Sequence, residues 1–268
     1  MRPILSSNEL RKISKAVMKG LSTFDASIDL GLSKTKVKLG KDGFYLEGKL
    51  VKLPKIREKD NSCYVLIGKE LQKAQFLSEE TGFLYKLEPT SYRPILKVSG
   101  TSMHKKPFLD RLHKDQLKGR ILDSGTGLGY SAILAAKSAK QVITVEIDQN
   151  VIEMAKLNPY SQDLFSKKNI KLVLGDIVEE ILKFKDEEFN FIVFDAGTAK
   201  ASGHFFSLDN YKQAYRVLKT GGRLYHYLPR PQITKGRDFA AEVIKRIEKA
   251  GFSRIERNIE DSYVIADK

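Results

Sequence analysis

Apolar positions in the first hundred residues follow two spacings, one helical and one alternating. Residues 6–21 place apolar side chains three and four apart, which predicts a first helix with Asn8 as its N-terminal cap. Between residues 25 and 100, short and partly alternating runs are separated by glycine, aspartate and asparagine, which predicts a small antiparallel β module. Lys-Asp-Gly at 41–43 indicates a hairpin in this module, and residues 69–77 are predicted to form a short helix.

From residue 118 onward, apolar runs of strand length alternate with amphipathic segments of helical length. Strands are predicted in GRILDSG, QVITVEID, IKLVLGD, FNFIVFDAG and GRLYHYLP, each followed by a helix. This alternation is typical of an α/β fold with a doubly wound, mostly parallel sheet. The closing strands FSRIERNI and SYVIADK meet at a short turn and are expected to pair antiparallel at the sheet edge. We therefore predict a β-rich N-terminal module over 1–117 and a doubly wound domain over 118–268.

The net charge of +14 is concentrated in the N-terminal part of the chain. Residues 1–118 hold 24 Lys and Arg against 13 Asp and Glu, whereas residues 119–268 hold 23 against 20. A basic module beside a nearly neutral domain favours a polyanionic partner such as RNA. The alternative is a lysine-rich solvated surface of the kind that thermophile proteins often carry.

Other features of the composition favour a cytoplasmic protein. Cys63 is the only cysteine, so no disulfide can form within one chain. No apolar run reaches the ~18 residues of a membrane helix, and the N-terminus turns polar too early for a signal peptide. No Cys/His group has metal-ligand spacing, so no metal is expected. A dimer is compatible with the sequence, which leaves the oligomeric state open.

The sequence Ile121-Leu-Asp-Ser-Gly-Thr-Gly-Leu-Gly-Tyr-Ser131 places three alternating glycines directly after a predicted strand. A phosphate-binding P-loop ends in a lysine followed by a hydroxyl residue, and this glycine loop has no such lysine. A dinucleotide loop requires glycine at its sixth position, where this chain has Tyr130. Asp123 stands where a pyrophosphate would be repelled. Both of these nucleotide classes are therefore disfavoured.

S-adenosylmethionine fits the same loop better, because it is cationic and carries no phosphate. Asp123 can lie near its ammonium group, and glycines at 125, 127 and 129 let backbone amides approach the ligand closely. The start of the following helix can accept its carboxylate.

Asp123-Ser-Gly-Thr-Gly-Leu-Gly129 resembles the first motif of class I, Rossmann-like S-adenosylmethionine-dependent methyltransferases. The resemblance continues in order over residues 118–268 and implies a seven-stranded sheet. It implies that Glu146 binds the ribose hydroxyls, that Asp176 in Gly175-Asp176 binds the adenine amino group, and that Ile177 packs near the ring. Asp195 would face the transferred group. The implied cofactor-binding set is Asp123, Gly125, Thr126, Gly127, Gly129, Tyr130, Glu146, Ile147, Gly175, Asp176, Ile177 and Asp195.

The wider chain is similar to poorly characterised archaeal methyltransferases related to spermidine synthases, through KLEPT, VSGTSMHK and LDSGTGLGYSAI. This closer resemblance raises aminopropyl transfer from decarboxylated S-adenosylmethionine as the alternative activity. Spermidine synthases carry an Asp-x-x-Asp pair for the amine substrate, and this chain replaces the second acid, with Asp195 followed by Thr198. A third hypothesis is that the chain is an RNA-binding protein with no enzymatic activity.

Several candidate site residues also have structural explanations. Glu146 and Asp176 precede helices, where acids are favoured, and Asp176 can act as a simple cap. Asp195 is the candidate general base, and His104 and His204 are weaker catalytic candidates. Four aromatic residues are expected either to line the pocket of the methyl acceptor or to pack in the core: Phe205, Phe206, Tyr211 and Tyr215. We predict an S-adenosylmethionine-dependent methyltransferase. The sequence leaves its acceptor open, and RNA such as tRNA is the candidate that the basic N-terminal part favours.

Overall fold

The computed structural model describes residues 2–103, 106–195, 204–228 and 238–268. Packing divides the chain into two compact units, the first made of Met1–His104 with Asn150–Gln162 and the second of Lys105–Gln149 with Asp163–Lys268. The boundary that the sequence places at 117–118 stays a prediction.

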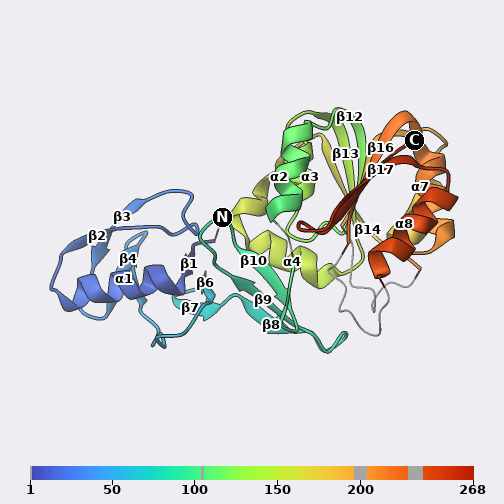
Figure 1. The fold of residues 1–268 in the computed structure, drawn as a ribbon. Coiled ribbons are helices and arrows are strands. Elements are labelled where there is room, and N and C mark those ends of the chain that lie inside the picture. The colour runs from blue at the N-terminus through green and yellow to red at the C-terminus, as the bar shows by residue number, and fades with distance from the viewer. Residues whose placement is uncertain (1, 104–105, 196–203, 229–237) are drawn as a thin grey trace. The chain divides into compact units, whose positions relative to one another are not determined.

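The N-terminal unit is built from short strands around one long helix (Figure 1). Its elements are β1 (Ile4–Ser6), α1 (Ser7–Met18), β2 (Thr23–Ala26), β3 (Thr35–Leu39), β4 (Gly43–Leu46), β5 (Lys49–Lys52), β6 (Cys63–Ile67), β7 (Glu70–Lys73), β8 (Gln75–Leu77), β9 (Leu84–Glu88), β10 (Ile95–Val98), β11 (Thr101–Ser102), α4 (Gln149–Leu157) and the 3₁₀ helix Pro159–Ser161. They form three sheets, ordered β1-β6-β7, β2-β3-β4-β5 and β11-β10-β9-β8. Neighbouring strands within these sheets pair antiparallel, as the alternating pattern predicts.

Helix α1 packs on the sheet β2-β3-β4-β5 and forms the core of this unit. Leu10 and Ile13 on the helix are buried with Phe44 on the sheet. The cap differs from the sequence prediction, because Ser6 and not Asn8 precedes the first turn. The Ser6 hydroxyl accepts a hydrogen bond from the backbone N–H of Glu9 at 3.1 Å.

The helix predicted over 69–77 is wrong. Strands β7 and β8 occupy this segment, and Leu71 pairs across the hairpin with Leu66. Gly68, at a φ of 63°, turns the chain between β6 and β7. Pairing with β6 and burial of Leu71 override the helical propensity of the local sequence.

The C-terminal unit contains one seven-stranded sheet, which confirms the predicted α/β fold. Its strands are β12 (Gly119–Ser124), β13 (Ala139–Glu146), β14 (Ile170–Leu174), β15 (Phe189–Phe194), β16 (Leu218–Tyr227), β17 (Ser253–Asn258) and β18 (Tyr263–Asp267). Its helices are α2 (Lys106–Asp115), α3 (Tyr130–Ala135), α5 (Gln162–Ser166), α6 (Ile177–Glu180), α7 (Leu208–Val217) and α8 (Phe239–Lys249). A 3₁₀ turn over Ile181–Lys183 follows α6, so the predicted helix there is shorter than expected.

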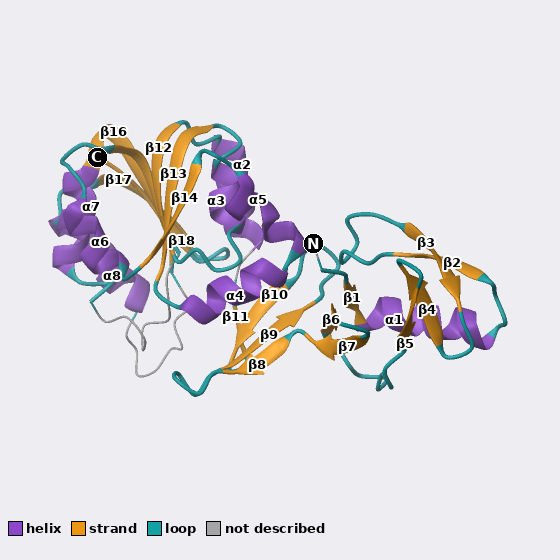
Figure 2. Ribbon diagram, turned by 180° about the vertical axis from the view of Figure 1, so that it is seen from behind, coloured by secondary structure: helices purple, strands orange, loops and turns teal. Residues whose placement is uncertain are grey.

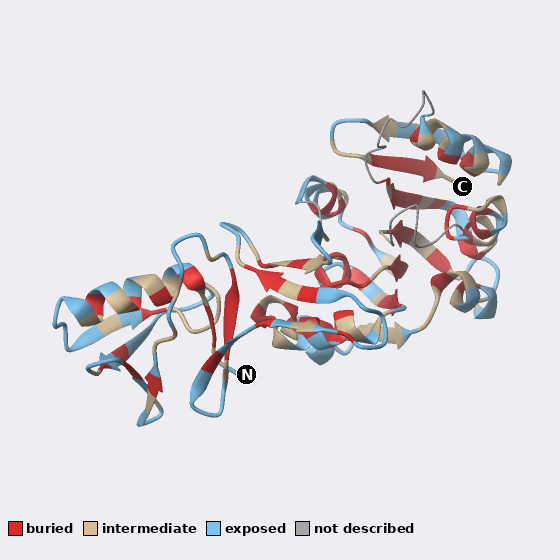
Figure 3. Cartoon of the chain, turned by 90° about the horizontal axis from the view of Figure 1, so that it is seen from below, coloured by how far each residue is buried: buried red, intermediate tan, exposed pale blue. Residues whose placement is uncertain are grey.

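The strand order is β14-β13-β12-β15-β16-β18-β17, with only the β18 pairings antiparallel. The closing pair β17–β18 therefore lies at the edge, as predicted. Helices α2 and α3 cover one side of the sheet and α7 and α8 the other (Figure 2). Buried residues follow the strands and the helix faces turned toward them (Figure 3). The chain runs outward through β12, β13 and β14 and then returns to place β15 beside β12, which creates a switch point.

Candidate functional site

The candidate site lies at the switch point, where the carboxyl ends of four parallel strands meet. Backbone hydrogen bonds hold these ends together: the Asp195 N–H donates to the Ser124 carbonyl at 3.1 Å, and the Gly175 N–H donates to the Glu146 carbonyl at 2.8 Å. The Gly125 N–H donates to the Val145 carbonyl at 2.9 Å. In open α/β sheets, this edge is where ligands bind.

The glycine loop leaves β12 and leads into α3. Gly125, Gly127 and Gly129 have φ values of 73°, 57° and 78°, a region that favours glycine. A side chain at 129 would also collide with Leu164, since its Cβ would lie 2.8 Å from a methyl carbon. Three left-handed residues in a row of five explain why the loop requires alternating glycines.

Glu146, at the end of β13, supports the loop from the neighbouring strand. Its side chain is buried, with 7% of its surface exposed. Oε2 accepts a hydrogen bond from the Gly127 N–H at 2.9 Å, and Oε1 accepts one from the Asp148 N–H at 3.1 Å. Burial raises the pKa of Glu146, while these backbone donors oppose the shift. Each oxygen keeps lone-pair capacity for a second donor, such as a ligand hydroxyl.

Asp123, at the end of β12, is fully buried beneath the loop. Its Oδ2 accepts a hydrogen bond from the Thr144 hydroxyl at 2.6 Å, so the Thr144 oxygen accepts in turn from the Thr126 hydroxyl at 2.7 Å. Burial raises the pKa of Asp123 to about 7, against the opposing effect of the hydroxyls of Thr144 and Ser131. Oδ1 makes no hydrogen bond within the part of the chain that the structure describes. A buried acceptor without a donor is a position where a cationic ligand group fits.

The end of β14 combines a cap with an apolar surface. Asp176 caps α6, accepting a hydrogen bond from the Val178 N–H at 2.9 Å, so the structural role considered for this residue is present. Ile177 lies in the hydrophobic core. Ile147 and Leu174 are exposed over 67% and 54% of their surfaces. Both lie next to Glu146, because Ile147 follows it in the chain and Leu174 is its Cα partner on β14. These two side chains, rather than Ile177, therefore offer exposed apolar surface at the site.

The remaining predicted residues are placed as follows. Tyr130 is buried at the start of α3. Asp195 follows β15 directly and is half-buried. His204 is exposed, and its carbonyl accepts a hydrogen bond from the Ser207 N–H at 3.1 Å. His104 and Thr198 lie outside the described residues.

A buried histidine that the sequence analysis did not select lies behind Asp195. The Nδ1 of His226 lies 3.1 Å from the carbonyl oxygen of Phe194, and its Nε2 lies 2.9 Å from the Tyr211 hydroxyl. A carbonyl can only accept, so Nδ1 carries the proton and Nε2 accepts from Tyr211. Burial lowers the pKa of His226 to about 4, which keeps it neutral. The ring therefore restrains the backbone immediately before Asp195.

The aromatic residues near this histidine belong to the core. Phe205, Phe206 and Tyr211 are buried in the same apolar cluster, and Tyr215 packs against it. The ring of Phe206 stacks on His226 with the centroids 5.6 Å apart. Core packing, the second of the two readings of these residues, accounts for all four. Alternation along β16 contained no sign of the His226 contacts, because both partners come from other elements.

Asp123 should make the stability of the ligand-free protein depend on pH. Because its pKa rises from 3.8 to about 7, the folded chain holds a proton that the unfolded chain releases between these values. Its contribution is complete at low pH and is lost as the pH rises through 7. We expect Asp123→Asn to gain about 2.6 kcal/mol in unfolding free energy relative to wild type between roughly pH 5 and 8. Urea titrations at both pH values measure this difference.

The stability contribution of His226 depends on pH in the opposite direction. The unfolding free energy of Asp123→Asn must therefore be compared with that of wild type at each pH. Its lowered pKa gives stability that is present above 6.5 and is lost as the pH falls toward 4. Both proteins retain His226, and its effect cancels in the difference. A difference that stays constant with pH would contradict a protonated Asp123 in the fold.

Comparison with known proteins decides the family. The profile of a methyltransferase domain matches residues 116–259. The chain belongs to the methyltransferase-domain family. This finding confirms the resemblance carried by the glycine loop and the acids that follow it.

Relatives of this methyltransferase-domain chain fall into two groups. An uncharacterized protein of Methanocaldococcus jannaschii is 37% identical, over 96% of this chain and 94% of that protein. A polyamine aminopropyltransferase of Saccharolobus islandicus is 30% identical over 43% of this chain and 40% of that protein. Among solved structures, spermidine synthase from Thermotoga maritima superposes with a TM-score of 0.57 at 21% identity, covering 72% of this chain and 71% of that one. At that identity, the structural likeness shows the fold alone.

The described residues contain no group of three or more His, Cys, Asp or Glu side chains placed to hold a metal ion. Within the same residues, every helix is too short or too polar to cross a lipid bilayer.

Proposed function

We propose that this protein is an S-adenosylmethionine-dependent methyltransferase. The observation that carries the proposal is the pair of buried carboxyls, Asp123 and Glu146, on either side of a glycine loop without a basic residue. Such a site favours a cationic nucleoside with free hydroxyls and disfavours a phosphate. The methyltransferase domain found by comparison supports the same activity.

The residues of the site fit the parts of this methyl donor. The free Oδ1 of Asp123 would accept from its ammonium group, and the remaining lone pairs of Glu146 would accept from the ribose hydroxyls. Ile147 and Leu174 would cover the adenine ring, with Asp176 at its amino group. When bound, S-adenosylmethionine supplies a methyl group activated by the sulfonium.

The protein itself then supplies position and, where required, a base. The acceptor atom must approach the methyl carbon in line with the bond to sulfur, which demands a restrained site. His226 restrains the Phe194 carbonyl, and through it the backbone that carries Asp195. Asp195, directly after β15, would accept a proton where the acceptor atom carries one.

Aminopropyl transfer is the second candidate, because polyamine aminopropyltransferases are among the relatives. Two features of this chain oppose it. The sequence has Thr198 where the spermidine synthase pattern has a second acid for the amine, and the net charge of +14 repels a polycation. The charge instead supports an RNA acceptor, which we propose on that ground.

Titration calorimetry with three ligands separates the two activities. We expect S-adenosylmethionine to bind at least about tenfold more tightly than its decarboxylated form, because only the intact ligand has a carboxylate for the loop amides. Methylthioadenosine, which lacks the whole amino-acid end, serves as the reference for the nucleoside alone. Tighter binding of the decarboxylated form would overturn methyl transfer in favour of aminopropyl transfer, and no binding of any ligand would overturn both.

A further inference from the structure

Sheet β2-β3-β4-β5 has one buried face and one open face. Val37, Phe44 and Val51 point toward α1 and are buried. Residues one position away along the strands point to the other face, where Lys36, Lys38, Tyr45 and Lys52 are exposed. Figures 1 and 2 show α1 on one side of this sheet and no described element of the N-terminal unit over the other.

An aromatic ring lies in the middle of the open face. Strand register places Lys38, Tyr45 and Leu50 in one row across three strands. The Nζ of Lys38 lies 5.7 Å from the centroid of the Tyr45 ring, which has 36% of its residue surface exposed. A Cβ at Gly40 would lie 3.3 Å from the Tyr45 ring and 3.1 Å from Leu50. Because residue 40 is glycine, the ring can pack in this position without a close contact.

The open face carries a net positive charge, with three lysines against one acid. Lys36, Lys38 and Lys52 form no ion pair with any residue that the structure describes. Asp25, the Cα partner of Lys36, is the one acid whose side chain lies on this face of the four strands. Three free lysines around one aromatic ring combine the two elements that bind a single-stranded nucleic acid: cations for phosphates and a flat ring for a base.

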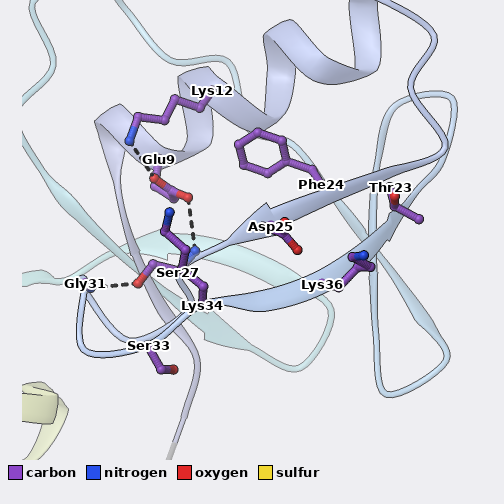
Figure 4. Close-up of a pocket in the computed structure, with 10 residues that line it drawn as sticks. All are labelled: Glu9, Lys12, Thr23, Phe24, Asp25, Ser27, Gly31, Ser33, Lys34 and Lys36. Carbon is purple, nitrogen blue, oxygen red and sulfur yellow. Dashed lines mark hydrogen bonds and ion pairs between the residues drawn. The ribbon is translucent and has the colours of Figure 1, made fainter.

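A cavity of about 640 Å³ lies beside the edge strand β2, lined by residues of α1, β2 and β3 and of the segment that joins β2 to β3 (Figure 4). Its volume lies within the range of about 300–1,000 Å³ typical of small-molecule sites. Lys12, Lys34 and Lys36 line it together with Phe24. Two acids line it as well, so the cavity holds three lysines against Glu9 and Asp25. Glu9 is already bound, at 3.1 Å to Lys12 and at 3.0 Å to the Ser27 N–H. The cavity thus offers a second place for a phosphate and a base next to the sheet.

We propose that the open face of β2-β3-β4-β5 and the adjoining β2 cavity bind a single-stranded segment of RNA. Tyr45 stacks on one base, and lysines 36, 38 and 52 contact the phosphates on either side. A duplex is a poor occupant, because its bases are paired and stacked on one another and cannot reach the ring. That this RNA is the methyl acceptor rests on the proposed function, whereas the binding itself does not.

Fluorescence anisotropy with a labelled 12-nucleotide single-stranded RNA tests the proposal on the full chain. We expect Tyr45→Ala to weaken binding about tenfold or more and Tyr45→Phe to retain most of it, because stacking needs only the ring. The double variant Lys38→Ala/Lys52→Ala should weaken binding and lower the salt slope of log K by about 1.4, the value for two phosphates on a single strand.

The matched control, Lys15→Ala/Lys19→Ala, removes two exposed lysines on the helix side of the sheet: Lys15 lies on α1 and Lys19 is its C-terminal cap. It has the same net charge as the sheet variant and should change binding less than about twofold. Equal loss in both double variants would overturn the proposal, because it would reduce the effect to overall charge. Unchanged binding in Tyr45→Ala, or equal or tighter binding of a duplex RNA or of polyglutamate, would also overturn it.

Calorimetry with S-adenosylmethionine on the same variants separates this proposal from the proposed function. If the sheet variants lose RNA but bind S-adenosylmethionine as the wild type does, both proposals stand. If RNA binding depends on Tyr45 while S-adenosylmethionine does not bind at all, the RNA face stands and the methyltransferase proposal fails.

Discussion

Replacement of Gly127 by aspartate is expected to reduce affinity for S-adenosylmethionine by at least about 100-fold, or roughly 2.7 kcal/mol. Gly127 lies in the middle of the loop at a φ of 57°, and its N–H donates to Glu146 at 2.9 Å. A side chain is strained at this φ, and the loop backbone would have to change to accommodate it. The new carboxylate also faces Glu146 and can accept from the amides that would otherwise bind the ligand carboxylate. Titration calorimetry measures the change.

Backbone strain must be separated from loss of the site, and Gly221 offers the matched control. It has a φ of 76°, and a Cβ there would meet no atom within 4 Å. Gly221→Ala should therefore carry a comparable cost of about 1 kcal/mol for a side chain at positive φ while leaving ligand affinity unchanged. If Gly127→Asp folds and binds S-adenosylmethionine as tightly as wild type, the loop is not the ligand site.

Removal of the Glu146 side chain is expected to lower both stability and ligand affinity. Glu146→Ala leaves the buried N–H of Gly127 and the partly buried N–H of Asp148 without their acceptor. A buried donor without a partner costs about 1–3 kcal/mol and a partly buried one costs less, so we expect the unfolding free energy to fall by about 1–4 kcal/mol. Without the carboxylate, the ribose hydroxyls also lose their acceptors, and binding of S-adenosylmethionine should become undetectable. Urea unfolding and calorimetry on one preparation give both values.

Glu146→Gln should cause only part of the loss of stability and affinity expected for Glu146→Ala. The amide keeps one acceptor oxygen but turns a donor toward the second N–H. We expect about half the loss of stability and a loss of affinity of about tenfold or more. Glu153→Ala is the control: this residue is exposed on α4 and its ion pair with Lys156 contributes little. A destabilised Glu146→Ala protein with wild-type affinity would confine Glu146 to a structural role.

Local patterns were sufficient to predict most elements of the C-terminal unit and the position of the glycine loop. Each parallel strand is an apolar run bounded by turn residues, and each helix has its own apolar spacing. The φ values of Gly125, Gly127 and Gly129 follow from the same short sequence. These features depend on neighbours in the chain, which is why the sequence displays them.

Contacts between distant segments had no comparable signal. Residues 69–77 have a helical pattern, yet pairing with β6 makes them strands, because burial of Leu71 outweighs local propensity. His226 looked like one of several alternating residues, and only the fold brings it to Phe194 and Tyr211. The exposed Ile147 and Leu174 likewise become neighbours of Glu146 through the pairing of β13 with β14.

The sequence by itself determined the α/β class, the family of the loop, and the excess of positive charge in the N-terminal part. Tertiary structure decided which acids are buried and which lysines share a surface. Asp123 is shielded from solvent because β13 and β15 pair with β12 on its two sides. This burial raises the pKa of Asp123 to about 7. Lysines 36, 38 and 52 become one face around Tyr45 because strand register aligns residues that lie up to sixteen positions apart. Burial and register arise from pairing between segments, and no local pattern contains them.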